Sequence, residues 1–167
     1  ADTGSPENGG DITRGMYVYG IESAGAHTNG FTKLREIDSK YGIPEDVKMY
    51  LGQSHICYVD IMDEIISILG EHNIRVMGKA HITGGGFQDN IDRILPAGIH
   101  VKMDRWELND AWQWVFDHAG MEWESFIRVF NAGWGFCFIT DGIIGDGIMG
   151  DDINCKNKKI KLLGIIE

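Results

Sequence analysis

The feature that most constrains the fold of this chain is a sequence pattern that occurs three times. In each case a predicted strand adjoins a run of small residues that includes polar side chains. The three segments are residues 23–30, 81–90 and 130–135. Glycine lets a backbone approach a ligand closely, and free N–H groups at a helix start attract anions. Any one segment taken alone is better explained as a tight turn, because glycine is the default turn residue. The residues therefore leave two interpretations open, structural turns or a site for an anionic ligand.

Apolar patterns predict strands and helices that alternate irregularly along the chain. Strands are expected at residues 16–22, 74–82, 99–103, 134–140 and 160–166. Helices are expected after a cap at Thr28 or Asn29, from Pro44, at about residues 54–69, around Ile91 and Leu95, and at residues 109–119 and 122–129. This order predicts an α/β fold of the α+β-like kind, in which helices pack on a mixed sheet.

The organisation along the chain is expected to be simple. Residues 1–13 are polar and glycine-rich, so they are expected to form a flexible lead-in. Residues 14–167 are expected to form a single domain with one core, since 43% of the chain is hydrophobic. The glycine- and aspartate-rich stretch at residues 141–152 is expected to be a loop.

Charge and cysteine content exclude several functional classes. The formal net charge is −10, which disfavours general binding to nucleic acid but still permits a phosphate ligand at a local site. No apolar run approaches the roughly 18 residues that cross a bilayer, and residues 1–15 lack the pattern of a secretory signal. The three cysteines form no C-x-x-C pair, which favours reduced thiols. We therefore expect a cytoplasmic protein without nucleic-acid or membrane partners.

His27 is the histidine that the pattern most favours as functional. It lies among small polar residues at a turn, where it could donate to a phosphate or transfer a proton near neutral pH. A structural histidine bonded to the local backbone explains the pattern equally well. His81 ends a predicted strand beside glycines and is a weaker candidate. The remaining histidines are expected on the surface or on helix faces: His55, His72, His100 and His118.

No metal site is predicted from the spacing of metal-ligating residues. The chain has no H-x-x-x-H or C-x-x-C pattern, so zinc is not expected. The carboxylates near the end of the chain fail the pattern of an EF-hand loop and are expected to be solvated; they are Asp141, Asp146, Asp151 and Asp152. Gly25 and Gly30 have the gap of a P-loop, but the lysine that should follow is missing.

The three segments resemble stretches of the C-terminal domain of AIR synthase (phosphoribosylformylglycinamidine cyclo-ligase). The first stands here as Ser23-Ala24-Gly25-Ala26-His27-Thr28-Asn29-Gly30. The second stands as Ala80-His81-Ile82-Thr83-Gly84-Gly85-Gly86-Phe87, followed by Asn90-Ile91-Asp92-Arg93-Ile94-Leu95-Pro96. The third stands as Arg128-Val129-Phe130-Asn131-Ala132-Gly133-Trp134-Gly135. Order and spacing match over roughly residues 11–140 and again at the last strand.

The resemblance implies a layered α/β architecture like that of the AIR synthase C-terminal domain, with the family's N-terminal ATP-binding domain absent. It implies a ligase of de novo purine biosynthesis that closes FGAM to AIR. ATP phosphorylates the amide oxygen of FGAM, and the nearby amine then attacks and closes the ring. The implied cofactors are ATP and Mg²⁺, whose ligands are expected mainly in the missing domain. The implied partners are FGAM, a separate ATP-binding half, and a second subunit in a homodimer or heteromer.

The match also implies roles for individual residues. His27 and Asn29 would be catalytic. Substrate-binding roles would fall to Ser23, Gly25, Thr28, Thr83, Gly84, Gly85, Gly86, Asn90, Asn131, Gly133 and Gly135. An alternative is a non-catalytic remnant, or a regulatory or interaction module of the same superfamily.

Overall fold

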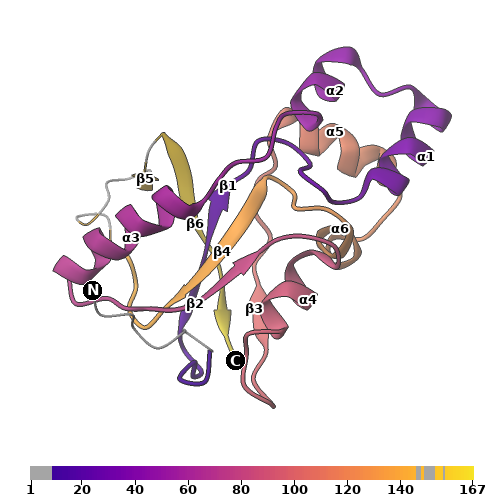
Figure 1. Cartoon of the computed structure of the whole chain (residues 1–167). Coiled ribbons are helices and arrows are strands. Elements are labelled where there is room, and N and C mark those ends of the chain that lie inside the picture. Colours follow the sequence, from indigo (N-terminus) through magenta and orange to yellow (C-terminus); the bar gives the residue numbers. More distant parts are fainter. Residues whose placement is uncertain (1–8, 146–147, 149–152, 156) are drawn as a thin grey trace.

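A six-stranded sheet is the centre of the computed structural model, which describes residues 9–145, 148, 153–155 and 157–167 (Figure 1). Its strands are β1 (Tyr17–Glu22), β2 (Val76–His81), β3 (Val101–Met103), β4 (Trp134–Thr140), β5 (Ile153–Cys155) and β6 (Lys158–Ile166). The spatial order is β2-β4-β1-β6-β3, and β5 pairs with β6 outside this path. Each of these pairings is antiparallel.

The helices lie between and beside these strands. They are α1 (Phe31–Tyr41), α2 (Glu45–Leu51), α3 (Val59–Glu71), α4 (Gly86–Asp92), α5 (Asp110–Ala119) and α6 (Trp123–Val129). α5 shows why they begin and end where they do. Asn109 accepts the N–H of Trp112 at 3.0 Å and caps the first turn, and Gly120 ends the helix at φ 62. None of the described helices is long and apolar enough to cross a membrane.

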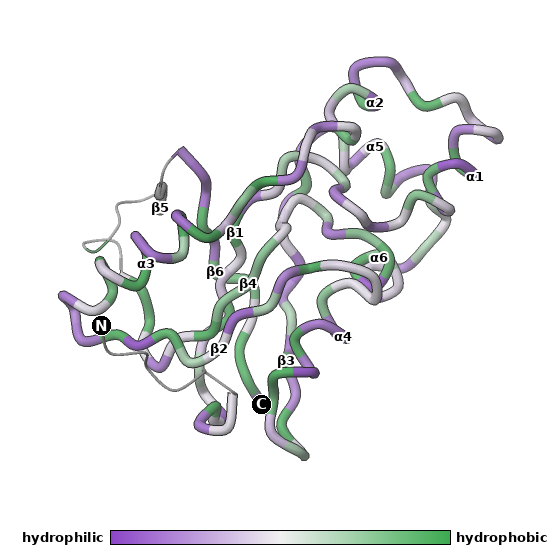
Figure 2. Tube along the Cα trace, in the orientation of Figure 1, coloured by the Kyte–Doolittle hydropathy of each residue, from purple (hydrophilic) through white to green (hydrophobic). Residues whose placement is uncertain are grey.

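Alternate residues of the strands face two separate hydrophobic clusters. Val18 of β1 and Ile139 of β4 belong to the larger cluster, together with residues of α1, α2, α4, α5 and α6. Tyr19 and Phe138, one position away in each strand, stack at 5.6 Å in the smaller cluster, which α3 covers. Figure 2 shows hydrophobic and hydrophilic residues alternating along α3, as a helix with one buried side requires. Among the helices that the structure describes with their bounds, α3 lies on one face of the sheet and the other five lie on the opposite face.

An aromatic group anchors the larger cluster. The fully buried ring of Phe126 lies 4.8 Å from Phe130, 4.9 Å from Phe116 and 6.1 Å from Trp112, measured between ring centroids. α4 packs against α6, and both helices contribute residues to this larger cluster. This packing fixes the position of residues 130–135, which follow α6 directly.

The structure confirms the layered architecture and corrects several element boundaries. The helix predicted from about residue 54 begins at Val59. Residues 53–58 are not helical, and the Tyr58 hydroxyl, just before the helix, donates to the Glu22 carbonyl at 3.1 Å. The short helix predicted around Ile91 and Leu95 is α4, which lies earlier. β5 was not predicted. Half of the expected loop at residues 141–152 lies outside the described residues, namely 146–147 and 149–152, as do residues 1–8 of the lead-in. Ile12, also in the predicted lead-in, is 1% exposed and belongs to the core.

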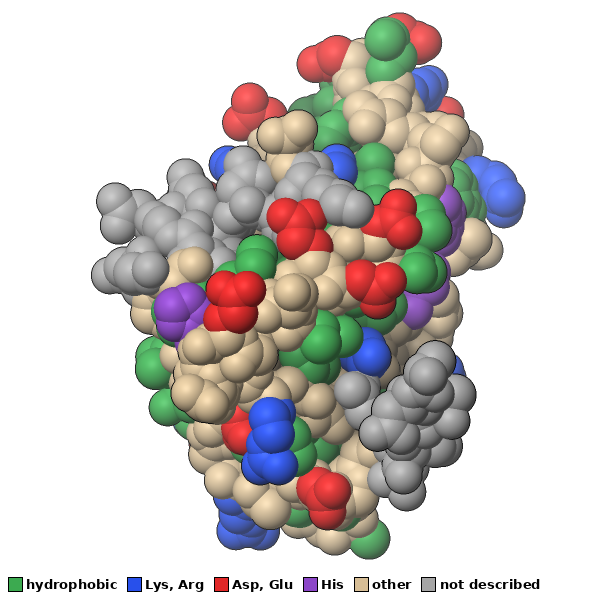
Figure 3. Space-filling view, turned by 60° about the vertical axis from the view of Figure 1, so that its left-hand side comes forward, with side chains coloured by type: hydrophobic (Ala, Val, Ile, Leu, Met, Phe, Trp, Pro, Cys, Tyr) green, Lys and Arg blue, Asp and Glu red, His purple; other side chains and the backbone are tan. Residues whose placement is uncertain are grey.

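The surface matches the acidic composition. Figure 3 shows carboxylate side chains spread over one face, with hydrophobic side chains between them and not gathered into one patch. The large hydrophobic side chains that remain exposed come from α1, α2, α3, β6 and the segment after β4: Phe31, Tyr41, Met49, Val59, Ile66, Leu162, Ile165 and Ile143. Isolated exposed apolar residues of this kind are normal for a folded domain.

The aromatic group should dominate stability. We expect Phe126→Ala to lower the free energy of unfolding by about 3–5 kcal/mol, because it removes a fully buried ring and leaves a cavity. Phe31→Ala is the control, since Phe31 is 41% exposed, and should cost less than about 1 kcal/mol. Urea denaturation followed by circular dichroism measures both. Equal losses for the two variants would contradict this account of the core.

Candidate functional site

The topology of the sheet brings the three glycine-rich segments to one end. β4 is antiparallel to both β1 and β2, so the end of β1, the end of β2 and the start of β4 lie together. Glu22 pairs with Trp134, and His81 pairs with Phe136. Segment 23–30 leaves β1 here, segment 81–90 leaves β2, and segment 130–135 enters β4 (Figure 1).

A β-bulge lies at this same end. Ile21 and Glu22 are consecutive in β1, but their partners Phe136 and Trp134 are separated by Gly135. Gly135 is therefore one residue in excess on β4, and its carbonyl accepts the N–H of Ile82 at 3.0 Å instead. Bulges of this kind bend a strand and redirect the neighbouring side chains.

The side chain of Asn131 ties the first segment to the third. Its Nδ2 donates to the Gly25 carbonyl at 2.9 Å, and its Oδ1 accepts the N–H of Gly133 at 3.1 Å. The Ser23 N–H donates to the Gly133 carbonyl at 2.8 Å, and the Ser23 hydroxyl donates to the Gly25 carbonyl at 3.0 Å. Ser23 and Asn131 are both buried, so these bonds replace the solvation that the polar groups lose.

The side chain of Asn29 ties the first segment to the second. Its Nδ2 donates to the Thr83 carbonyl at 2.6 Å. Asn90 then holds the second segment together, since its Nδ2 lies within hydrogen-bond distance of the carbonyls of Thr83, Gly84 and Gly86. Its Oδ1 accepts from the Thr83 hydroxyl at 3.1 Å. Asn90 thus has a structural role here, and its contact with a substrate stays a prediction.

Two glycines are required by close approach. A Cβ on Gly25 would overlap the Tyr50 carbonyl, and a Cβ on Gly135 would overlap the Tyr58 hydroxyl and lie 2.6 Å from Cε1 of His27. Gly84 differs from both, because it is exposed and a Cβ there would meet no atom within 4 Å. Gly84 is therefore a place where a ligand can approach the backbone.

His27 and Asn29 each have a buried polar atom without a hydrogen-bond partner. His27 Nε2 accepts the N–H of Ala24 at 3.2 Å, which places the ring proton on Nδ1, and Nδ1 is buried with no partner. Asn29 Oδ1 is also buried with no partner. Native proteins pair almost all such atoms, so an unpaired buried atom indicates a role other than stabilising the fold.

Backbone strain points to the same place. Outside glycine, positive φ angles among the described residues occur at His27, Ala132 and two asparagines. Asparagine tolerates this conformation, whereas His27 (φ 53) and Ala132 (φ 46) adopt it at an energetic penalty. Both lie in the predicted site, and strain of this kind concentrates at functional sites.

The ring of His27 lies beside two further histidines. It stacks on His55 with 4.2 Å between ring centroids, and His55 meets His81 edge-on at 5.7 Å. Tyr58 and Phe136 pack against His81 at 5.9 and 6.1 Å. His27 is 5% exposed, while His55 and His81 are exposed.

Burial keeps His27 and the Tyr58 hydroxyl uncharged at neutral pH. Desolvation, followed by the neighbouring charges of His55, His81 and Lys158, lowers the pKa of His27 to about 4. Desolvation, followed by the charge of His55, also lowers the pKa of His81. Burial raises the pKa of the Tyr58 hydroxyl, which therefore stays protonated.

The predicted site residues all lie in the three joined segments, but they differ in exposure. Thr28 and Gly84 are exposed. The buried members are Ser23, Gly25, His27, Asn29, Gly86, Asn90, Asn131 and Gly135, and the partly buried ones are Thr83, Gly85 and Gly133. Sequence analysis missed His55 and Tyr58, which come from the link between α2 and α3. No spacing pattern connects that link to the other segments.

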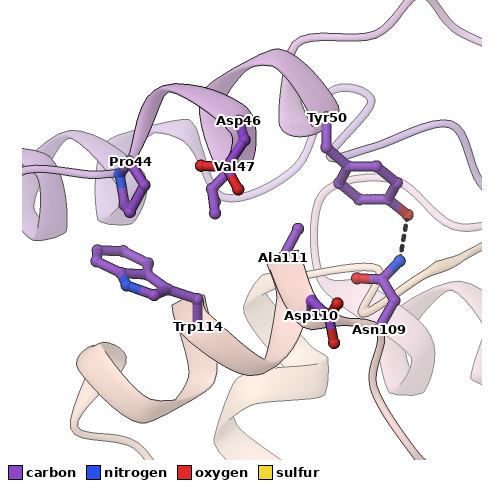
Figure 4. Close-up of a pocket in the computed structure, with 8 residues that line it drawn as sticks. All are labelled: Pro44, Asp46, Val47, Tyr50, Asn109, Asp110, Ala111 and Trp114. Atoms are coloured by element: carbon purple, nitrogen blue, oxygen red, sulfur yellow. Dashed lines mark hydrogen bonds between the residues drawn. The ribbon is translucent and has the colours of Figure 1, made fainter.

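A separate cavity of about 440 Å³ lies between α2 and α5 (Figure 4). Trp114 and Tyr50 line it together with the carboxylates of Asp46 and Asp110. The Tyr50 hydroxyl accepts from Asn109 Nδ2 at 2.7 Å, which Figure 4 draws as a dashed line. Its lining contains none of the residues predicted from the three segments.

Comparison with known proteins identifies the family of the chain. The family model of the C-terminal domain of AIR synthase related proteins matches residues 13–141. The chain belongs to this family. The match covers all three glycine-rich segments and the strands β1, β2 and β4 that join them.

Individual relatives agree with the family assignment. The chain is similar to phosphoribosylformylglycinamidine cyclo-ligases of Bordetella avium (31% identical over 166 residues) and Oleidesulfovibrio alaskensis (28% over 161 residues). The alignments cover 95% and 90% of this chain but only 47% and 44% of these relatives. The chain therefore spans less than half the length of the curated AIR synthases that it matches.

The close approach at Gly135 gives a matched pair of variants. We expect Gly135→Ala to lower the free energy of unfolding by about 1–3 kcal/mol, because the added methyl group must displace His27 or Tyr58. Gly84→Ala should stay within about 0.5 kcal/mol of the unchanged chain, because its Cβ points into open space. Urea denaturation compares them. If Gly84→Ala is as destabilising as Gly135→Ala, the described packing of the site is wrong.

The low pKa of His27 predicts a loss of stability in mild acid. Between pH 6.5 and about 4 the unfolded chain binds a proton at His27 that the folded chain does not. Stability should therefore fall as pH drops through this window, by up to about 3 kcal/mol from this group. Unfolding measured at pH 7 and 4.5 should show a smaller fall for His27→Gln than for the unchanged chain. His72→Gln is the control, and a fall that is the same in all three proteins would refute the assignment.

Proposed function

We propose that this chain forms the substrate-side half of a phosphoribosylformylglycinamidine cyclo-ligase, which closes FGAM to AIR in an ATP-dependent step of purine biosynthesis. Family membership and the names of the relatives support this activity. Since the chain matches less than half of each relative, the activity requires the remaining half as well.

The observation that most supports a catalytic site is the pair of buried, unpartnered atoms on His27 and Asn29. His27 Nδ1 offers a donor and Asn29 Oδ1 offers an acceptor, and the two residues are neighbours in one strained turn. A substrate that presents both an oxygen and an N–H group would satisfy them together. FGAM does so at its reacting atoms, the amide oxygen that is phosphorylated and the amine that attacks.

The proposed step can be written in terms of these two residues. His27 Nδ1–H donates to the amide oxygen of FGAM, and Asn29 Oδ1 accepts from the attacking amine and orients it. The amine nitrogen forms a bond to the amide carbon, the phosphorylated oxygen leaves as phosphate, and the departing phosphate takes the proton of the amine. A neutral imidazole suits the role of His27 because Nε2 accepts the Ala24 N–H while Nδ1 keeps the proton that it donates.

ATP and Mg²⁺ are assigned to the other half of the enzyme. ATP supplies the phosphoryl group that turns the amide oxygen into a leaving group. The side chains that gather beside His27 are imidazoles, whereas Mg²⁺ takes oxygen ligands such as carboxylates. This donor set does not fit Mg²⁺, so we assign no Mg²⁺ ligand to these side chains. A cytoplasmic location and a dimeric assembly belong to the same proposal.

Complementation tests the proposal directly. The chain is mixed with FGAM, ATP and Mg²⁺, with and without a separately supplied N-terminal AIR synthase half, and AIR is measured. We expect product only in the mixture of both halves. His27→Ala should then lower kcat by about 10²–10³-fold, as removal of one hydrogen-bond donor to a reacting oxygen does. His72→Ala should leave kcat unchanged, because His72 is exposed and belongs to none of the three segments.

The negative outcome is equally informative. The supplied N-terminal half must first form AIR with the C-terminal half of its own enzyme, and the chain must be shown to be folded. If the mixture then forms no AIR and calorimetry shows no binding of FGAM, the chain is a non-catalytic module of the family.

A further inference from the structure

Three histidines from distant parts of the sequence meet at one point of the site. One ring nitrogen each of His27, His55 and His81 lies within 4.8 Å of the other two. His27 belongs to the turn after β1, His55 to the link between α2 and α3, and His81 to the end of β2. Histidine is the commonest metal ligand among side chains, and three imidazoles make the donor set of many zinc sites.

We propose that His27, His55 and His81 bind one divalent metal ion such as Zn²⁺. The three imidazoles leave a fourth coordination position of the ion open. The ion belongs to the class that prefers imidazole nitrogen, which includes Zn²⁺, Ni²⁺ and Cu²⁺. Mg²⁺ and Ca²⁺ are excluded by the same donors, because both take oxygen ligands.

The required rearrangement falls on the two exposed histidines. Tetrahedral Zn²⁺ holds its nitrogen ligands at roughly 2.0–2.1 Å, so the three nitrogens must move closer than in the structure. His27 is held by its buried turn, whereas His55 and His81 are exposed and can change rotamer. His55 must also leave its stack on His27, because the lone pair of an imidazole nitrogen lies in the plane of the ring.

The surroundings of the three rings act on a bound cation in two ways. The positive charge of Lys158 acts on His27 and opposes the ion. Tyr58 and Phe136 pack against His81 and limit the access of water on that side.

Binding at His27 should change its tautomer. Nε2 now accepts the Ala24 N–H, so the nitrogen without a partner is Nδ1, which carries the ring proton. Coordination through Nδ1 moves this proton to Nε2 and opens the bond to Ala24, and the ring stays neutral throughout. Because the proposed ring closure uses the same Nδ1–H as a donor, Zn²⁺ and FGAM exclude one another at His27. The change is visible in the ¹⁵N shifts of the imidazole, and a purely structural histidine would not show it.

The test uses the full chain and Zn²⁺ alone. Isothermal calorimetry at pH 7.5 should give one Zn²⁺ per chain, with affinity lowered at least about 10-fold in His55→Ala and in His81→Ala. Both variants remove exposed rings, and circular dichroism checks that they stay folded. His72→Ala, which removes an exposed histidine elsewhere, should bind like the unchanged chain. Co²⁺ in place of Zn²⁺ should give the visible absorption of a four-coordinate site.

Two results would overturn the proposal. One is the absence of stoichiometric Zn²⁺ binding by the folded chain. The other is Zn²⁺ binding that His55→Ala and His81→Ala leave unchanged, which would place the ion elsewhere on the acidic surface. Neither measurement uses FGAM, ATP or a second half, so the outcome is independent of the complementation experiment.

Discussion

The antiparallel pairing of β4 with both β1 and β2 is the constraint on which the rest of the site depends. A strand between two antiparallel neighbours begins where both of them end, and each of these three strand ends opens into a glycine-rich segment. The sheet therefore brings the three turns to one end. The amides of Asn131 and Asn29 then fix the turns at hydrogen-bond distances of 2.9 and 2.6 Å.

The polar interior of the site is unevenly satisfied. Asn90 and Asn131 use both ends of their amides, so their burial is compensated. His27 and Asn29 do not, and His27 is also strained. A domain that needed these turns only for stability would gain from pairing the two atoms, since each unpaired buried group is destabilising by about 1–3 kcal/mol. We therefore assign Asn90 and Asn131 to the scaffold of the site, and His27 and Asn29 to the groups that contact a substrate.

Sequence reasoning succeeded where local chemistry decides the outcome. Asn109 and Gly120 mark the ends of α5 because capping is a property of the terminal residues themselves. It failed where residues distant in sequence meet, as at the start of α3. There the Tyr58 hydroxyl bonds to the Glu22 carbonyl, a contact that the sequence pattern does not reveal. Local and distant contacts can also be separated in the site. The glycine-rich segments can be recognised in the sequence. His55 lies in a link without a recognisable pattern, so only the three-dimensional structure reveals that it stacks on His27.

The bulge at Gly135 gives the site an unusual genetic basis. Without that one residue, β4 would continue beside β1 in regular register and its preceding side chains would turn to the opposite face. The hollow that accommodates the His27 ring thus corresponds to a single codon. Loss of that codon would remove the residue that makes room for the ring, while β1 and β4 would still have residues to pair.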